Sequence, residues 1–230
     1  MFLKYYIMVW NMEEKCEQKI VVPRIGETAP DFEASTTKGK MKLSDFKGKW
    51  VILFSHPADF TPVCTTEFVA FAKINDELTK RNVQLIGLSI DSLYSHIAWL
   101  RRIKEKLGVT IPFPVIADLD MKVATLFGMI HPDESTTAAI RCVFFIDPEM
   151  TVRAIVYYPL NVGRNMDEVL RVIDALQTAD KYKVAMPANW RPGDKVIVPP
   201  PTTTDAAEQR EHEGYEYIDW FLCKKELPTK

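Results

Sequence analysis

The stretch WVILFSHPADFTPVCTTEF, residues 50–68, joins an apolar run to a turn and then to a helical pattern. The run at its start has the length expected for a buried strand. Thr61 is a good helix N-cap and Pro62 suits the first helical position, so a helix is predicted to begin here. The third helical position then holds Cys64, where unpaired backbone N–H groups and the positive end of the helix dipole stabilise a thiolate. This position favours a reactive cysteine over a small inert core residue.

Strand and helix patterns alternate along the chain on both sides of this stretch. Residues 25–48 carry turn signals that predict a hairpin. Further strands are expected at residues 83–90, 112–118, 140–147 and 151–158, and helices at 61–81, 94–108, 121–128 and 165–182. The residues expected to face inward from the helix at 94–108 are Ile97, Leu100, Ile103 and Leu107. This order predicts an α/β fold, in which a mixed central sheet carries helices on both faces.

The chain divides into three parts by composition. Residues 1–24 are an extension that either packs on the domain or reflects a start assigned too early, with Met12 as the true start. Its apolar run is too short for a signal peptide or a membrane span. Residues 25–182 contain the α/β pattern. Residues 183–230 are rich in proline and polar residues and hold two aromatic clusters, which predicts an arm that packs on a second subunit.

Composition argues against several classes of function. The 230 residues are 47% apolar and carry a net charge of −2, so there is no sign of a nucleic-acid or membrane partner. The four cysteines are too far apart for a C-x-x-C motif or a pair of zinc ligands: Cys16, Cys64, Cys142 and Cys223. A chain of this length needs no disulfide framework, so we expect a reducing, cytoplasmic compartment.

Polar residues near Cys64 and one distant arginine are further candidates. His56 lies in the turn before the helix, where a plain polar role is the more common one. Glu67 follows Cys64 by three residues on roughly the same helix face, and a solvated carboxylate is the alternative. Arg141 interrupts a very apolar strand, so it lies either at an exposed strand end or in the core beside an anion. Cys142 alternates to the opposite face of that strand and is expected to be a core residue.

The segment PADFTPVC, residues 57–64, fits the P-x-x-x-T-x-x-C signature of the peroxiredoxins. The longer run SHPADFTPVCTTEF resembles the one-Cys-type subfamily, which includes many archaeal and thermophilic bacterial thiol peroxidases. The resemblance covers about residues 25–225 and includes the arginine-bearing strand and the C-terminal DWFLC. It implies a thioredoxin-like fold, arms that exchange across a homodimer, and dimers assembled into a decameric ring. It also implies that no metal or organic cofactor is needed.

The same resemblance implies a thiol-dependent peroxidase with Cys64 as the peroxidatic nucleophile. Its thiolate would attack the O–O bond of hydrogen peroxide or an organic hydroperoxide and become a sulfenic acid. Thr61 would hydrogen-bond the sulfur and the peroxide, and Arg141 would hold the thiolate and polarise the peroxide. Pro57 would shield the sulfenate from water.

Two more residues take roles from the resemblance, whereas Cys223, rather than the weaker candidate Cys16, takes its role as the only cysteine of the C-terminal arm. His56 resembles the subfamily's histidine beside the site, and Glu67 resembles the carboxylate that orients the arginine. Cys223 would be the resolving cysteine, forming a disulfide with Cys64 of another subunit before a thioredoxin- or glutaredoxin-like protein reduces it. Archaeal-type relatives often carry two C-terminal cysteines and this chain has one, so a one-cysteine cycle with an external thiol stays open.

Two functions outside this scheme are also open. A redox-switched holdase or peroxide sensor would suit the aromatic arm. A thioredoxin-type disulfide exchanger would need a C-x-x-C motif, whereas residues 61–64 read TPVC.

Overall fold

The computed structural model describes residues 22–228. The predictions for the N-terminal extension, including Met12 and Cys16, fall outside them and stay predictions. The strands of the larger sheet are β1 Glu33–Thr36, β2 Gly39–Lys42, β3 Trp50–Ser55, β4 Val83–Ser89, β5 Val115–Ala117, β6 Arg141–Ile146 and β7 Val152–Tyr158. The helices of this part are η1 Leu43–Phe46, α2 Pro62–Lys80, α3 Leu93–Leu107, α4 Lys122–Leu126 and α5 Met166–Tyr182.

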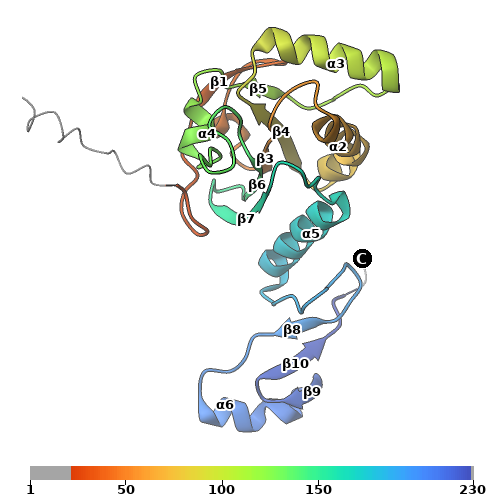
Figure 1. The fold of residues 1–230 in the computed structure, drawn as a ribbon. Coiled ribbons are helices and arrows are strands. Elements are labelled where there is room, and N and C mark those ends of the chain that lie inside the picture. Colours follow the sequence, from red (N-terminus) through yellow and green to blue (C-terminus); the bar gives the residue numbers. More distant parts are fainter. Residues whose placement is uncertain (1–21, 229–230) are drawn as a thin grey trace, which may run out of the picture.

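Seven strands form one mixed sheet in the order β2-β1-β5-β4-β3-β6-β7. The strands β3, β4 and β5 run parallel to one another, whereas β6, β7 and the β1–β2 hairpin add antiparallel pairs. Helices lie on both sides of the sheet, as Figure 1 shows. The α/β architecture predicted from the sequence is confirmed.

The central strand β3 is buried on both faces. Val51 and Leu53 belong to the core cluster that includes residues of α4, whereas Ile52 and Phe54 belong to the cluster beneath α2, α3 and α5. A strand covered on both sides needs apolar residues at every position, which explains its apolar run. The turn after Ser55 and the first turn of α2 therefore start from the middle of the sheet.

The inward face predicted for α3 is wrong at two positions, because Ile97 and Leu107 are 42% and 52% exposed. The helix instead buries His96, Trp99 and Ile103. The Trp99 indole N–H donates to a hydroxyl on α2, and the ring of His96 finds acceptors on both sides. Apolar periodicity misses this face partly because His96, one of its three buried residues, is polar and is held by specific partners.

The arm forms a small sheet of its own at the far end of α5 (Figure 1). Its elements are β8 Val196–Val198, α6 Thr204–Gln209, η2 Arg210–His212, β9 Glu216–Asp219 and β10 Leu222–Lys225, with the strand order β8-β10-β9. The sequence interpretation gave no secondary structure here, because strands of three or four residues leave almost no periodic signal. Large apolar side chains of the arm are exposed by 37–54%: Tyr217, Ile218, Trp220 and Phe221.

Candidate active site

Cys64 lies in the first turn of α2 and is completely buried. The helix begins at Pro62 after Thr61, so the predicted helix start is confirmed, although the Thr61 side chain makes no capping hydrogen bond to the helix. The Thr61 hydroxyl donates to the carbonyl of Ala58 at 2.8 Å, which uses its proton and leaves oxygen lone pairs free to accept. Pro57 stands in the same turn and is half-buried.

The Arg141 guanidinium lies beside the thiol in the core. Its Nη1 is 3.3 Å from Cys64 Sγ and 2.6 Å from Glu67 Oε2. Its Nε and Nη2 both donate to the carbonyl of Leu160, at 2.9 and 2.8 Å. The residue is only 2% exposed. Of the two positions open from the sequence, the buried one beside an anion is therefore correct.

Glu67 is shared between two arginines. Arg164 donates to its carboxylate from Nε at 2.8 Å, from Nη2 at 2.6 Å and from the backbone N–H at 2.9 Å. Burial alone would raise the pKa of Glu67, but Arg164 and then Arg141 outweigh burial and hold that pKa below its usual range. The carboxylate is therefore ionised, and the group of two guanidiniums and one carboxylate keeps an excess positive charge beside Cys64.

Arg164 is the residue that the sequence analysis missed. It comes from the loop before α5, and its Nη1 donates to the carbonyls of Ser55 and Cys142 at 2.8 and 3.1 Å. The guanidinium also stacks over Phe54 and Phe71, with distances of 5.0 and 5.4 Å to the ring centroids. A single arginine in a polar loop carries no periodic signal, so only the folded structure reveals its burial.

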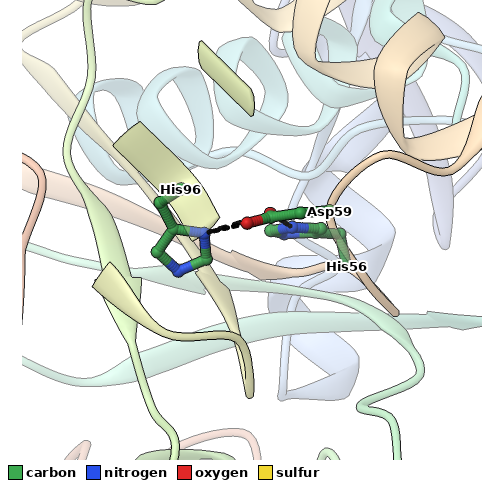
Figure 2. A group of neighbouring side chains, drawn as sticks. All are labelled: His56, Asp59 and His96. Atoms are coloured by element: carbon green, nitrogen blue, oxygen red, sulfur yellow. Dashed lines mark hydrogen bonds and ion pairs between the residues drawn. The ribbon is translucent and has the colours of Figure 1, made fainter. Parts of the chain in front are cut away.

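A second buried polar group consists of His56, Asp59 and His96 (Figure 2). His96 Nε2 is 3.0 Å from the carbonyl of Ile116, which can only accept, so Nε2 carries a proton. His96 Nδ1 lies 2.8 Å from Asp59 Oδ2. Burial would raise the pKa of Asp59, but the hydrogen bonds from His56 and His96 outweigh it and lower the pKa to about 2. The carboxylate is therefore ionised and lies within hydrogen-bond distance of both histidine rings.

The hydrogen bond between His56 and the Asp59 carboxylate determines which ring nitrogen of His56 carries the proton. Its Nε2 lies 3.1 Å from Asp59 Oδ1 and therefore donates, which leaves the lone pair on Nδ1. That Nδ1 is buried, and no residue within 22–228 is its hydrogen-bond partner. Burial lowers the pKa of His56, with Asp59 offsetting only part of the effect, so the ring is neutral. The ring packs on Trp99 and on Phe68, which follows Cys64 by one turn of α2.

These three side chains could in principle hold a metal ion, since their ligand atoms lie within 4.8 Å of one another. Their direct contacts at 2.8–3.1 Å already account for the arrangement as a hydrogen-bonded group. We therefore assign them a positioning role behind the first turn of α2.

The other two described cysteines lie in different surroundings. Cys142 is fully buried in the core cluster on the opposite face from Arg141, and burial raises the pKa of its thiol. This confirms the prediction of an inert core residue. Cys223 lies in β10 of the arm, 1% exposed, and donates to the carbonyl of Asp219 at 3.3 Å. Cys64 thus lies in α2, which packs on the seven-stranded sheet, whereas Cys223 lies in the three-stranded sheet of the arm.

Comparison with known proteins identifies the family of the chain that carries this site. The AhpC/TSA family model matches residues 25–155, and the model of the C-terminal domain of 1-Cys peroxiredoxin matches residues 175–214. A peroxiredoxin of Aquifex aeolicus is 59% identical over 219 residues, covering 90% of this chain and 99% of the relative. The chain belongs to the peroxiredoxin family. The resemblance given by residues 55–68 is confirmed, and this peroxiredoxin is a thiol-dependent peroxidase.

Other relatives support the same assignment. A peroxiredoxin of Methanosarcina mazei is 55% identical, covering 91% of this chain and 100% of the relative. The structure of yeast mitochondrial 1-Cys peroxiredoxin superposes with a TM-score of 0.80 at 45% identity, covering 89% of this chain and 99% of the other. The structure of peroxiredoxin 6 of Arenicola marina superposes with a TM-score of 0.79 at 38% sequence identity. This match covers 90% of this chain and 99% of the other. The thioredoxin-like fold is therefore confirmed. Among the described residues, we find no helix with the length and apolarity needed to cross a bilayer.

Replacement of His56 by Gln should reduce the acid sensitivity of the fold. The pKa of His56 is lowered from 6.5 in the folded state, so the unfolded chain takes up this proton first. Stability is therefore lost as the pH falls below about 6.5. Gln keeps an N–H for Asp59 but does not titrate. Urea unfolding at pH 7.5, 6.5 and 5.5 should show a shallower decline for His56→Gln than for wild type.

His212→Gln, at an exposed histidine of the arm, serves as the matched control and should follow wild type. Measurements above pH 5 also stay clear of the titration of Asp59. Its contribution to stability is lost only as the pH falls from 3.8 towards about 2. Equal slopes for wild type and His56→Gln would mean that the folded state does not hold His56 neutral.

Proposed function

We propose that this peroxiredoxin reduces hydrogen peroxide and organic hydroperoxides through a sulfenic acid at Cys64. The observation that carries the proposal is the contact of 3.3 Å between Arg141 Nη1 and Cys64 Sγ inside a buried group with excess positive charge. A thiolate supplies the negative charge that this group lacks. Burial strengthens the attraction, because water does not screen it.

The proposed reaction begins with attack of the Cys64 thiolate on one oxygen of the peroxide. An S–O bond forms as the O–O bond breaks, and the leaving hydroxide or alkoxide is released as water or an alcohol after protonation. Arg141 lies where it can stabilise the charge that develops on the oxygens, and the free lone pairs of Thr61 can accept from the peroxide hydroxyl. Pro57 would limit access of water to the sulfenate. His56 would help to position this turn through its hydrogen bond with Asp59.

We propose that the second half of the cycle uses Cys223 of another subunit. The two thiols belong to separate parts of one chain, and both are buried, so a disulfide requires a second copy and local opening of both segments. The exposed aromatic side chains of the arm favour a dimer, because a second subunit would bury them. A thioredoxin- or glutaredoxin-like protein would then reduce the disulfide. A decameric ring and a cytoplasmic location remain predictions from the sequence.

Replacement of Cys64 by Ser should abolish peroxide turnover, because the hydroxyl cannot form the sulfenic acid. Consumption of hydrogen peroxide in the presence of dithiothreitol measures this, and circular dichroism checks that the fold is intact. Cys142→Ala, at the other buried thiol of the sheet, is the matched control and should keep near wild-type turnover. Substantial activity in Cys64→Ser would refute the central assignment. A single oxidation of wild type without further turnover would favour a sensor or holdase.

Loss of Arg141 should slow the peroxide step without unfolding the protein. Removing one electrostatic donor of this kind typically costs about 10²–10³ in rate. Stopped-flow fluorescence of Arg141→Met at pH 7 should show this decrease. Arg153→Met removes another ion-paired arginine of the sheet, bound to Asp180 at 2.6 Å, and should leave the rate unchanged. Equal rates for Arg141→Met and wild type would place the guanidinium outside the reaction.

Replacement of Cys223 by Ser should stop formation of an intersubunit disulfide. After one equivalent of peroxide, wild type should run as a disulfide-linked dimer on a non-reducing gel. Cys223→Ser should run as a monomer whose Cys64 is oxidised further to sulfinic acid by excess peroxide. If wild type stays monomeric and loses only the Cys64 thiol, the enzyme follows a one-cysteine cycle and the proposed role of Cys223 is wrong.

A further inference from the structure

Arg210 lies beside Cys223 in the core of the arm. Cys223 is paired with Val198 of β8, and the next residue, Pro199, accepts a hydrogen bond from Arg210 Nη2. Arg210 is only 8% exposed, although it carries a permanent charge. Burial of a positive charge is unfavourable unless a negative group lies near it, so the partners of Arg210 have to be identified.

The guanidinium has one donor left over. Its Nη1 donates to Glu213 at 2.8 Å, and its face packs over Tyr215 at 5.0 Å from the ring centroid. The Nε–H is buried, and no acceptor for it lies in the part of the chain that the structure describes. A buried donor on a charged group costs free energy when it is unpaired. Glu213 offsets the charge only in part, because its side chain is 42% exposed and water screens the ion pair.

Titratable side chains near Cys223 come from η2, from β9 and from the turn between them. They are Arg210, Glu213, Tyr217 and Asp219, and Arg210 is the one cation of this set. Burial would lower the pKa of Arg210, but its interaction with Glu213 and then with the nearby Cys223 raises that pKa.

The arrangement repeats the one at Cys64. Arg141 uses one terminal nitrogen for Glu67 and other nitrogens for a backbone carbonyl, and it faces a buried thiol. Arg210 likewise binds one glutamate and one backbone carbonyl next to a buried thiol. The two cysteines that would react with each other therefore each have a buried arginine.

We propose that Arg210 stabilises the thiolate of Cys223 and so activates it as the resolving nucleophile; this rests on the proposed function. On ionisation, the sulfur loses its bond to the Asp219 carbonyl and accepts from the free Arg210 Nε–H. The thiolate then attacks the Cys64 sulfenic acid, so that an S–S bond forms and the S–O bond breaks. The leaving hydroxide takes the proton lost by Cys223, giving one water. Cys223 is oxidised and the Cys64 sulfur is reduced.

The test measures ionisation of Cys223 directly. In a Cys64→Ser background, iodoacetamide alkylation of the Cys223 peptide is followed by mass spectrometry from pH 5 to pH 10. Arg210→Met should move the midpoint of the pH profile up by about one pH unit and slow alkylation at pH 7 by about fivefold to tenfold. Arg210→Gln, which keeps an N–H donor but lacks the charge, should show the same shift, and Arg210→Lys should show less.

The midpoint of the alkylation pH profile distinguishes an effect of the Arg210 charge from an effect on the packing of the arm. Easier opening of the arm would change the alkylation rate at every pH but would leave the midpoint in place. Arg191→Met, at an exposed arginine of the same arm, is the matched control and should match the Cys64→Ser parent. Unchanged midpoints in both Arg210→Met and Arg210→Gln would overturn the proposal.

A second measurement distinguishes this proposal from the function on which it rests. With Cys64 restored, the rate of disulfide formation after peroxide should fall at pH 7 in Arg210→Met by a factor similar to that for alkylation. A shifted midpoint together with no Cys64–Cys223 disulfide in wild type would refute the resolving role of Cys223. A normal disulfide rate in Arg210→Met would refute the role of Arg210 and leave that of Cys223 intact.

Discussion

The active site depends on one carboxylate shared by two arginines. Glu67 binds Arg141 and Arg164 in a region where none of the three is more than 7% exposed. Neither arginine can lose this partner without leaving a buried charge uncompensated. The shared carboxylate fixes the position of the Arg141 guanidinium, and that position decides whether the thiol faces a positive group. The chemistry of Cys64 is therefore set by an ion pair on the next turn of the same helix.

The same group joins parts of the fold that are distant in sequence. It connects the first turn of α2 with β6 and with the loop before α5, and Arg164 also ties down the end of β3 through the Ser55 carbonyl. On the neighbouring side, the Asp59 carboxylate holds two histidine rings against the packing beneath α2 and α3. Two buried carboxylates thus hold the cysteine-bearing turn from both sides. Such networks stabilise the fold only when each member is paired, so the turn has little freedom to shift.

The sequence predicts the features that depend on local signals. The start of α2 at Pro62 and the buried strand before it follow from capping residues and a short apolar run, and both are correct. Whether Arg141 is buried depends on a glutamate 74 residues away, so the sequence left it open. Arg164 is missed because a loop has no periodicity. The inward face of α3 is misplaced because burial of His96 requires the Asp59 carboxylate. The roles of the site residues came from a family signature, which local physical signals do not contain.

The distance along the chain between the thiol and its arginines matters during synthesis. Arg141 follows Cys64 by 77 residues, and Arg164 follows Glu67 by 97 residues. Cys64 is therefore made before either guanidinium, with β4, α3, β5 and α4 between them in the chain. The positive group beside the thiol is complete only after β6 and the loop before α5 have been made and packed against α2. A chain that stops before residue 141 therefore has its cysteine but neither buried arginine.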